Sequence, residues 1–223
     1  MIKKLIFDLD NTLIMWKEEY NVAVQKALEM TYSINNKEMS DIINNYADEF
    51  ENDLSNPKRY YDKQVFLDYI NKKTNYNLNM EFLDNWLKCN VIYSTPNSLE
   101  KSVHNTLKYL SKKYELVILT DWFGETQIER LKKVDIYKHF SKVFAAEQYA
   151  KPKKEAFLQA IGENKPEECA MIGDSIEVDI LGAQNAGISN LVLLDNKNKA
   201  NIFRKELNGV HIIKNLANLK TLF

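Results

Sequence analysis

Carboxylate, hydroxyl and ammonium side chains gather in four short polar motifs of this chain. The motifs are Asp8-Leu9-Asp10-Asn11-Thr12, Thr120-Asp121, Lys151-Pro152 and Gly173-Asp174-Ser175, and Asp179 follows the last of them. Carboxylates that meet in a fold raise its free energy unless a cation neutralises them. Oxygen ligands without His or Cys favour a hard ion, so Mg²⁺ is the expected cofactor.

Thr120 and Lys151 add groups that bind anions. Magnesium takes few protein ligands and completes its octahedron with water and phosphate oxygens. The hydroxyl of Thr120 and the ammonium of Lys151 would then face the other phosphate oxygens, one as a neutral donor and one as a point charge. This set of groups suits phosphoryl transfer, in which catalysis is mostly positioning and charge stabilisation.

Short apolar runs predict the β-strands that position these motifs. The runs are Leu5–Phe7, Leu116–Leu119, Val143–Ala146, Ala170–Ile172 and Leu191–Leu194, with a weaker candidate at Val210–Ile213. They are too continuous for half-exposed strands, and segments of helical period separate the last four main runs. The pattern predicts an α/β fold with a Rossmann-like, doubly wound parallel sheet. Ligands bind beyond the carboxyl ends of such strands, so the four motifs should converge.

The stretch between residues 15 and 95 has helical patterns and no convincing strand. Two apolar faces are clear, one with Met39, Ile42, Ile43, Tyr46 and Phe50, the other with Phe82, Leu83, Trp86 and Leu87. The helical period of both faces predicts amphipathic helices. We therefore predict an all-helical cap domain at residues 15–95, inserted into an α/β catalytic core of residues 1–14 and 96–223.

The motif order resembles the haloacid dehalogenase (HAD) superfamily, specifically its phosphatases with an α-helical cap of the C1 type. The resemblance covers nearly the whole chain, and it includes Leu119 before Thr120 and the stretch from Gly173 to Gly187. Each short motif is weak evidence by itself, whereas four motifs in order, each after a predicted strand, are a strong signal.

The resemblance implies a role for each site residue. Asp8 would attack phosphorus and carry the covalent phosphate, and Asp10 would act as general acid and then general base. Mg²⁺ would be held by Asp8, by the backbone carbonyl of Asp10 and by Asp174. Thr120 and Lys151 would bind the phosphate. Asp179 would orient metal-bound waters or Lys151.

Some residues have an alternative interpretation. Asp179 also fits the first turn of a following helix, where the helix dipole favours a carboxylate. Asp121 stands where the family commonly has Asn, and an extra carboxylate there would repel phosphate unless it points away or meets a cation. Trp16, Lys17, Arg59, Tyr60 and Tyr61 could line the cleft, but aromatic residues of a small helical domain usually serve its core. We assign none of these five to the site.

Three rival functions share parts of this pattern. A phosphotransferase or mutase of the β-phosphoglucomutase type would pass the same aspartyl-phosphate to a sugar. A haloacid dehalogenase needs neither a metal nor an acid at position 10, so Asp10 and Asp174 argue against it. A signalling receiver also gathers Asp, Thr, Lys and magnesium, but its accepting Asp usually lies on a middle strand and it lacks a large helical insertion.

Composition and charge limit the partners, cysteine roles and cellular location that we expect for this protein. Thirty Lys+Arg and 31 Asp+Glu give a net charge of -1, which offers no electrostatic case for nucleic acid or an anionic membrane as partner. Cys89 and Cys169 have no metal-ligand spacing and are expected to be buried thiols. No apolar run or leader pattern indicates a membrane span or signal peptide. We expect a cytoplasmic enzyme acting on a small phosphorylated metabolite, of undetermined substrate and oligomeric state.

Overall fold

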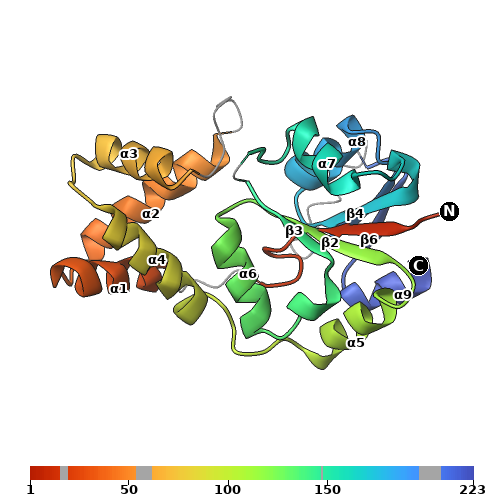
Figure 1. Ribbon diagram of the computed structural model, residues 1–223, viewed down its shortest axis with the longest axis horizontal. Helices are drawn as coiled ribbons and strands as arrows, with labels where there is room; N and C mark the ends of the chain where they lie inside the picture. Colours follow the sequence, from red (N-terminus) through yellow and green to blue (C-terminus); the bar gives the residue numbers. More distant parts are fainter. Residues whose placement is uncertain (16–19, 54–61, 147, 196–206) are drawn as a thin grey trace.

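A computed structural model describes residues 1–15, 20–53, 62–146, 148–195 and 207–223 (Figure 1). It contains a six-stranded sheet in the order β3-β2-β1-β4-β5-β6, and every neighbouring pair is parallel. The strands are β1 (Lys4–Phe7), β2 (Glu115–Leu119), β3 (Lys142–Phe144), β4 (Cys169–Gly173), β5 (Asn190–Leu194) and β6 (Val210–Ile213). This arrangement confirms the predicted Rossmann-like α/β fold.

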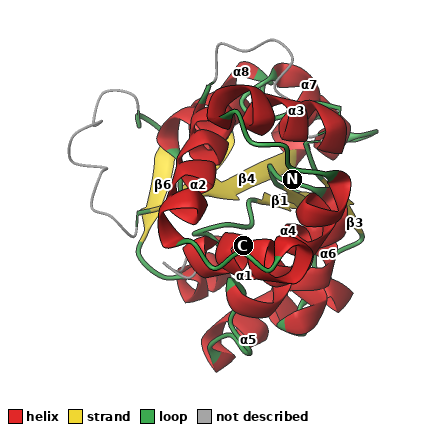
Figure 2. Cartoon of the chain, turned by 90° about the vertical axis from the view of Figure 1, so that its left-hand side faces the viewer, coloured by secondary structure: helices red, strands yellow, loops and turns green. Residues whose placement is uncertain are grey.

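Helices cover both faces of the sheet because both faces are apolar. Leu5 and Phe7 of β1 join one buried cluster, whereas Ile6 joins the other, as the two-residue period of a strand requires. The first cluster packs against α5 (Lys101–Leu110), α6 (Gly124–Lys133) and α9 (Leu219–Leu222), and the second against α7 (Lys154–Ile161), η3 (Ile176–Leu181) and α8 (Gly182–Asn185). Figure 2 shows the strands enclosed between helices on either side. The 3₁₀ segments within the described residues are Tyr137–His139, Pro166–Glu168 and Leu216–Asn218.

Four helices follow β1 and lie beside the sheet, on the left of Figure 1. They are α1 (Tyr20–Tyr32), α2 (Lys37–Asn52), α3 (Lys63–Thr74) and α4 (Met80–Tyr93). Asn36, Asp62 and Asn79 start α2, α3 and α4, and each side chain accepts a hydrogen bond from a backbone N–H of the first turn, which is the usual N-cap arrangement. These helices form the predicted all-helical insertion. Its boundaries at residues 15 and 95 stay a prediction.

The third predicted strand was placed too far along the chain. We expected Val143–Ala146, whereas β3 ends at Phe144. Ala146 is fully buried, but it packs with the apolar residues of the inserted helices instead of continuing the sheet. The run is apolar because Val143 and Phe144 pack, partly buried, against the two faces of the sheet core, whereas Ala146 packs among the inserted helices.

Both cysteines are buried thiols, as predicted. Among the helices that the structure describes, none has the length and apolar character needed to cross a membrane.

Candidate active site

Asp8 and Lys151 form a buried ion pair at the carboxyl end of the sheet. Asp8 follows β1 and its backbone N–H donates to the carbonyl of Ile172 on β4, at 2.9 Å. Lys151 Nζ lies 2.6 Å from Asp8 Oδ1 and 2.5 Å from Asp179 Oδ1. All three side chains are almost inaccessible to solvent. One ammonium therefore bridges two carboxylates that come from opposite parts of the sequence.

Burial and charge act in opposite directions on these groups. Burial alone would lower the pKa of the Lys151 ammonium, but the carboxylates of Asp179 and Asp8 outweigh it and raise that pKa above its usual value. Burial raises the pKa of Asp8 well above that of an exposed aspartate. Lys151 works against this rise, while Asp179 and Asp174 add to it. Asp8 therefore needs positive charge nearby to stay ionised.

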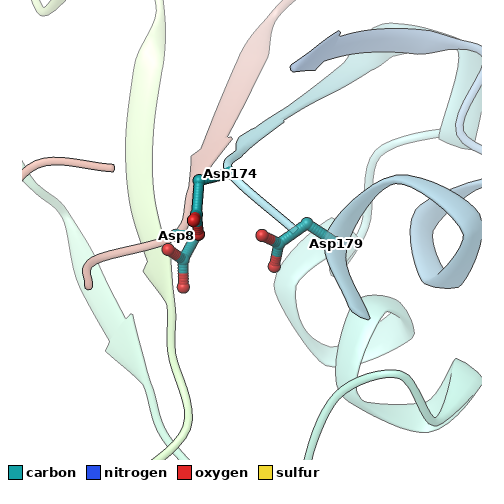
Figure 3. Close-up of side chains that lie close together, drawn as sticks. All are labelled: Asp8, Asp174 and Asp179. Atoms are coloured by element: carbon teal, nitrogen blue, oxygen red, sulfur yellow. The ribbon is translucent and has the colours of Figure 1, made fainter. Parts of the chain in front are cut away.

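Asp174 completes a cluster that suits a divalent cation. It follows β4, and one carboxylate oxygen each from Asp8, Asp174 and Asp179 lie within 4.8 Å of one another. Figure 3 shows Asp8 and Asp174 side by side, with Asp179 facing them from η3. Oxygen-only ligands at this spacing fit a hard ion such as Mg²⁺.

Asp179 is held on both of its oxygens. Oδ1 contacts Lys151, and Oδ2 accepts a hydrogen bond from the backbone N–H of Ser175 at 3.0 Å. It lies in the short helix η3, as the alternative interpretation had it, and its side chain also reaches Lys151. This geometry suits a group that orients Lys151.

Thr120 and Asp121 follow β2 and border the same space. The Thr120 hydroxyl donates to the carbonyl of Asp121 at 2.9 Å and accepts from Gln127 Nε2 at 2.8 Å. Asp121 Oδ1 accepts a hydrogen bond from the backbone N–H of Lys151 at 3.0 Å. The Asp121 carboxylate is thus bound by a backbone N–H group, and its charge also helps to raise the pKa of Lys151.

Asp10 is held by two residues of α6 that the sequence interpretation missed. Arg130 places Nη2 2.6 Å from Asp10 Oδ1 and Nη1 3.0 Å from Oδ2, and Gln127 Nε2 lies 3.1 Å from Oδ2. Arg130 is only 2 % exposed and also donates from Nε to Thr95 Oγ1. The available signal was a Gln and an Arg three residues apart, in the helix that follows the Thr120 motif.

Comparison with known proteins identifies the family. A model of haloacid dehalogenase-like hydrolases matches residues 2–187. The chain belongs to this family. It is therefore a HAD-like hydrolase, as the motif order predicts.

Relatives of this HAD-like hydrolase include phosphatases. The glyceraldehyde 3-phosphate phosphatase of Methanothermobacter thermautotrophicus is 27% identical and covers 100% of both chains. That of Pyrococcus furiosus is 27% identical over 85% of this chain and 80% of its own length. Among solved structures, the HAD-hydrolase YfnB of Bacillus subtilis has a TM-score of 0.68 at 20% identity, over 99% of this chain and 98% of its own. L-2-haloacid dehalogenase from Xanthobacter autotrophicus has a TM-score of 0.69 at 17% identity, covering 100% and 98%. Both structures share the fold.

The cleft of this HAD-like hydrolase lies between the sheet and α2. It has a volume of about 580 Å³ and is lined by all the site residues that the sequence predicted: Asp8, Asp10, Thr120, Lys151, Asp174 and Asp179. Asp48, Glu51 and Asn52 of α2 form the opposite wall. No motif marks these three residues. The cleft candidates Trp16, Lys17, Arg59, Tyr60 and Tyr61 lie outside the described residues.

Proposed function

We propose that this HAD-like hydrolase is a magnesium-dependent phosphatase that cleaves a small-molecule phosphomonoester through an aspartyl-phosphate on Asp8. The buried contact of Lys151 with Asp8, beside the Asp174 carboxylate, carries the proposal. It combines a nucleophile, a phosphate-binding cation and an oxygen-ligand cluster at the base of one cleft. The phosphatase names of relatives that match 100% and 85% of the chain support the same reaction class.

The proposed reaction has two steps at one phosphorus atom. Asp8 attacks phosphorus and forms an acyl phosphate, while Asp10 gives its proton to the leaving oxygen. Asp10 then takes a proton from water, and that water attacks phosphorus and releases phosphate with Asp8 restored. Lys151 and Thr120 would hold phosphate oxygens throughout.

Asp8, Asp174 and the backbone carbonyl of Asp10 would hold the metal, and Asp179 would keep Lys151 in place. Bound Mg²⁺ would neutralise charge on the transferring phosphate. The oxygen-only cluster supports this assignment. The solved structure of YfnB, a protein with the same fold, is described as bound to magnesium.

Glyceraldehyde 3-phosphate is the first substrate to test, because four of the relatives carry its name. A small phosphorylated metabolite as partner, a cytoplasmic location and the division into residues 15–95 and the remainder belong to the same proposal.

The central test is magnesium-dependent release of phosphate from phenyl phosphate by the purified chain. We expect Asp8→Asn to lower kcat more than about 1,000-fold, because the covalent path is then closed. Asp174→Asn should raise the magnesium concentration needed for half-maximal rate. Asp135→Asn, a matched change at an exposed ion pair with Lys138, should keep the wild-type rate.

Two outcomes would overturn parts of the proposal. An Asp8→Asn variant that keeps most of the activity would exclude covalent catalysis by Asp8. Transfer of the phosphoryl group to an added sugar, with little release of free phosphate, would replace hydrolysis with the mutase reaction.

A further inference from the structure

Asp121 contacts both residues that would bind phosphate. Its side-chain oxygen Oδ1 accepts a hydrogen bond from the backbone N–H of Lys151 at 3.0 Å. Its backbone carbonyl accepts another from the Thr120 hydroxyl at 2.9 Å. The family commonly has Asn at this position, and an amide oxygen can accept from Lys151 as well. The hydrogen bond therefore explains why a polar residue stands here, but it does not explain a charged one.

The neighbours of Asp121 fix the position of its carboxylate. Its backbone carbonyl also accepts a hydrogen bond from the buried Gln127, at 2.9 Å. Trp122, the next residue, has a φ of 89°, which strains an aromatic residue, and its ring packs against Phe66 and Phe123. With its backbone held in this way and its Oδ1 bonded to the neighbouring loop, the carboxylate cannot easily turn away when phosphate enters.

The negative charge of Asp121 acts on the site separately from the hydrogen bond. Lys151 Nζ contacts Asp8 at 2.6 Å and Asp179 at 2.5 Å, and the charge of Asp121 adds to theirs in raising the pKa of Lys151. One ammonium therefore faces three carboxylates. Asp179 and Asp8 each act on Lys151 more strongly than Asp121 does, so they suffice to keep it protonated.

The main effect of the Asp121 charge therefore falls on phosphate. Asp121 is half-buried and lines the same cleft as Asp8 and Lys151, so its carboxylate repels a phosphate dianion bound there. Substrate and inorganic phosphate both carry the dianion, and the repulsion weakens the binding of both. An effect that is uniform along the reaction raises KM and changes the chemical step little. It also speeds the loss of inorganic phosphate from the enzyme.

We propose that Asp121 is a positioning residue with two separable roles. Its hydrogen bond holds Lys151 in place for phosphoryl transfer, and its charge weakens the binding of phosphate and so promotes the release of inorganic phosphate. The inference rests on the proposed phosphatase function and adds the residue that sets the affinity for the product.

Two substitutions at position 121 separate the two roles. Asp121→Asn keeps the acceptor oxygen and removes the charge. We expect inorganic phosphate to bind about 3- to 10-fold more tightly, by isothermal titration calorimetry with magnesium present, because one nearby like charge is gone. The KM for phenyl phosphate should fall by a similar factor. The single-turnover rate constant should stay within about threefold of wild type, because Lys151 keeps its hydrogen bond.

Asp121→Leu removes the acceptor as well as the charge, with little change in size. We expect its single-turnover rate constant for phenyl phosphate to fall about 10- to 100-fold, because Lys151 loses the bond that positions it. The rate in Asp121→Asn then shows rescue by an acceptor oxygen. A single-turnover rate constant at saturating enzyme does not depend on the folded fraction of the sample.

Glu125→Gln is the matched control for loss of charge. Glu125 lies in the first turn of α6, its side chain is 89% exposed, and it does not line the cleft. This variant removes one negative charge close to Asp121 in the chain, yet it should bind inorganic phosphate within about twofold of wild type because solvent screens the charge.

The outcomes distinguish failure of this inference from failure of the phosphatase proposal. Phosphate affinity in Asp121→Asn that is equal to or below that of wild type overturns the role of the charge, as does equal tightening in Glu125→Gln. A wild-type rate constant in Asp121→Leu, or an equal loss in Asp121→Asn, overturns the role of the hydrogen bond. Folded wild-type protein that releases no phosphate from phenyl phosphate overturns the phosphatase proposal and this inference with it.

Discussion

The pairing of Arg130 with Asp10 determines where the proposed acid can act. Both carboxylate oxygens of Asp10 contact the guanidinium, and this fork geometry fixes the plane of the carboxylate as well as its position. Gln127 contacts Asp10 and also Thr120, so one side chain touches both the acid and the phosphate-binding hydroxyl. Arg130 is therefore a positioning residue for Asp10 in the proposed reaction.

Removal of this positioning should affect the chemical step more than binding. We expect Arg130→Ala to lower kcat by about 100-fold with a small change in KM, as a misplaced catalytic group does. Added guanidinium ion should restore part of the rate, and Arg130→Lys should remain below wild type because a single ammonium cannot hold both oxygens. Steady-state kinetics with and without added guanidinium measure kcat and KM of both variants. Equal kcat in wild type and Arg130→Ala would contradict the positioning role.

At the residue scale, the sequence was sufficient to predict which side chains meet at the site when each of them follows a strand. Asp8, Asp174 and Lys151 lie together because parallel strands end at one edge. Arg130 and Gln127 were not predicted because a polar face on a helix usually indicates solvent exposure. In α6 these two polar side chains are instead buried and contact Asp10. The positions of Asp48, Glu51 and Asn52 depend on how the inserted helices pack, which no local pattern specifies.

Among the elements, the tight approach of η3 to β4 holds Asp179 in place. A Cβ atom added to Gly173 at the end of β4 would lie 2.6 Å from the Cβ of Asp179, which is too close for real atoms. Asp179 in turn holds Lys151 against Asp8. The absence of a side chain at position 173 is thus what lets η3 bring its carboxylate to the site.

Gly173→Ala should therefore reduce activity while the fold remains. We expect a loss of about 10- to 100-fold in kcat/KM, because Asp179 must shift and Lys151 loses its second carboxylate. Gly209→Ala is the control, since a Cβ there meets no atom of the described residues within 4 Å and its φ of +81° adds about 1 kcal/mol of strain away from the cleft. Thermal unfolding and phosphate release distinguish the two variants. Full activity in folded Gly173→Ala would contradict the argument.

Strands β1, β2, β4 and β5 were predictable because burial on both faces makes them continuously apolar. The partly buried strand β3 shows where this criterion fails. Its apolar run continues into Ala145 and Ala146, but the sheet ends at Phe144. Hydrophobicity indicates burial and does not specify the partner, so a run that passes from the sheet to the inserted helices looks like one strand.

At the scale of the whole molecule, the inserted helices are joined to the core along α4 and α6. Lys133 Nζ donates to the carbonyls of Val91, Ile92 and Thr95, which end α4 and begin the chain that returns to the core. Trp122 and Phe123, which precede α6, pack among the aromatic rings of the inserted helices. We propose that α2 closes over the cleft about this junction and excludes water during transfer.

The contact between Trp86 and Trp122 gives this junction an optical signature. Two indoles with centroids 5.9 Å apart and planes inclined by 68° couple their electronic transitions, so circular dichroism should show an exciton couplet. Trp86→Phe and Trp122→Phe should each abolish it, and orthovanadate with magnesium should leave it intact if the helices pivot at this contact. Loss of the couplet on adding orthovanadate would mean that the helices separate there. The protein thus carries, without any label, a chromophore pair that reports whether its two parts remain in contact.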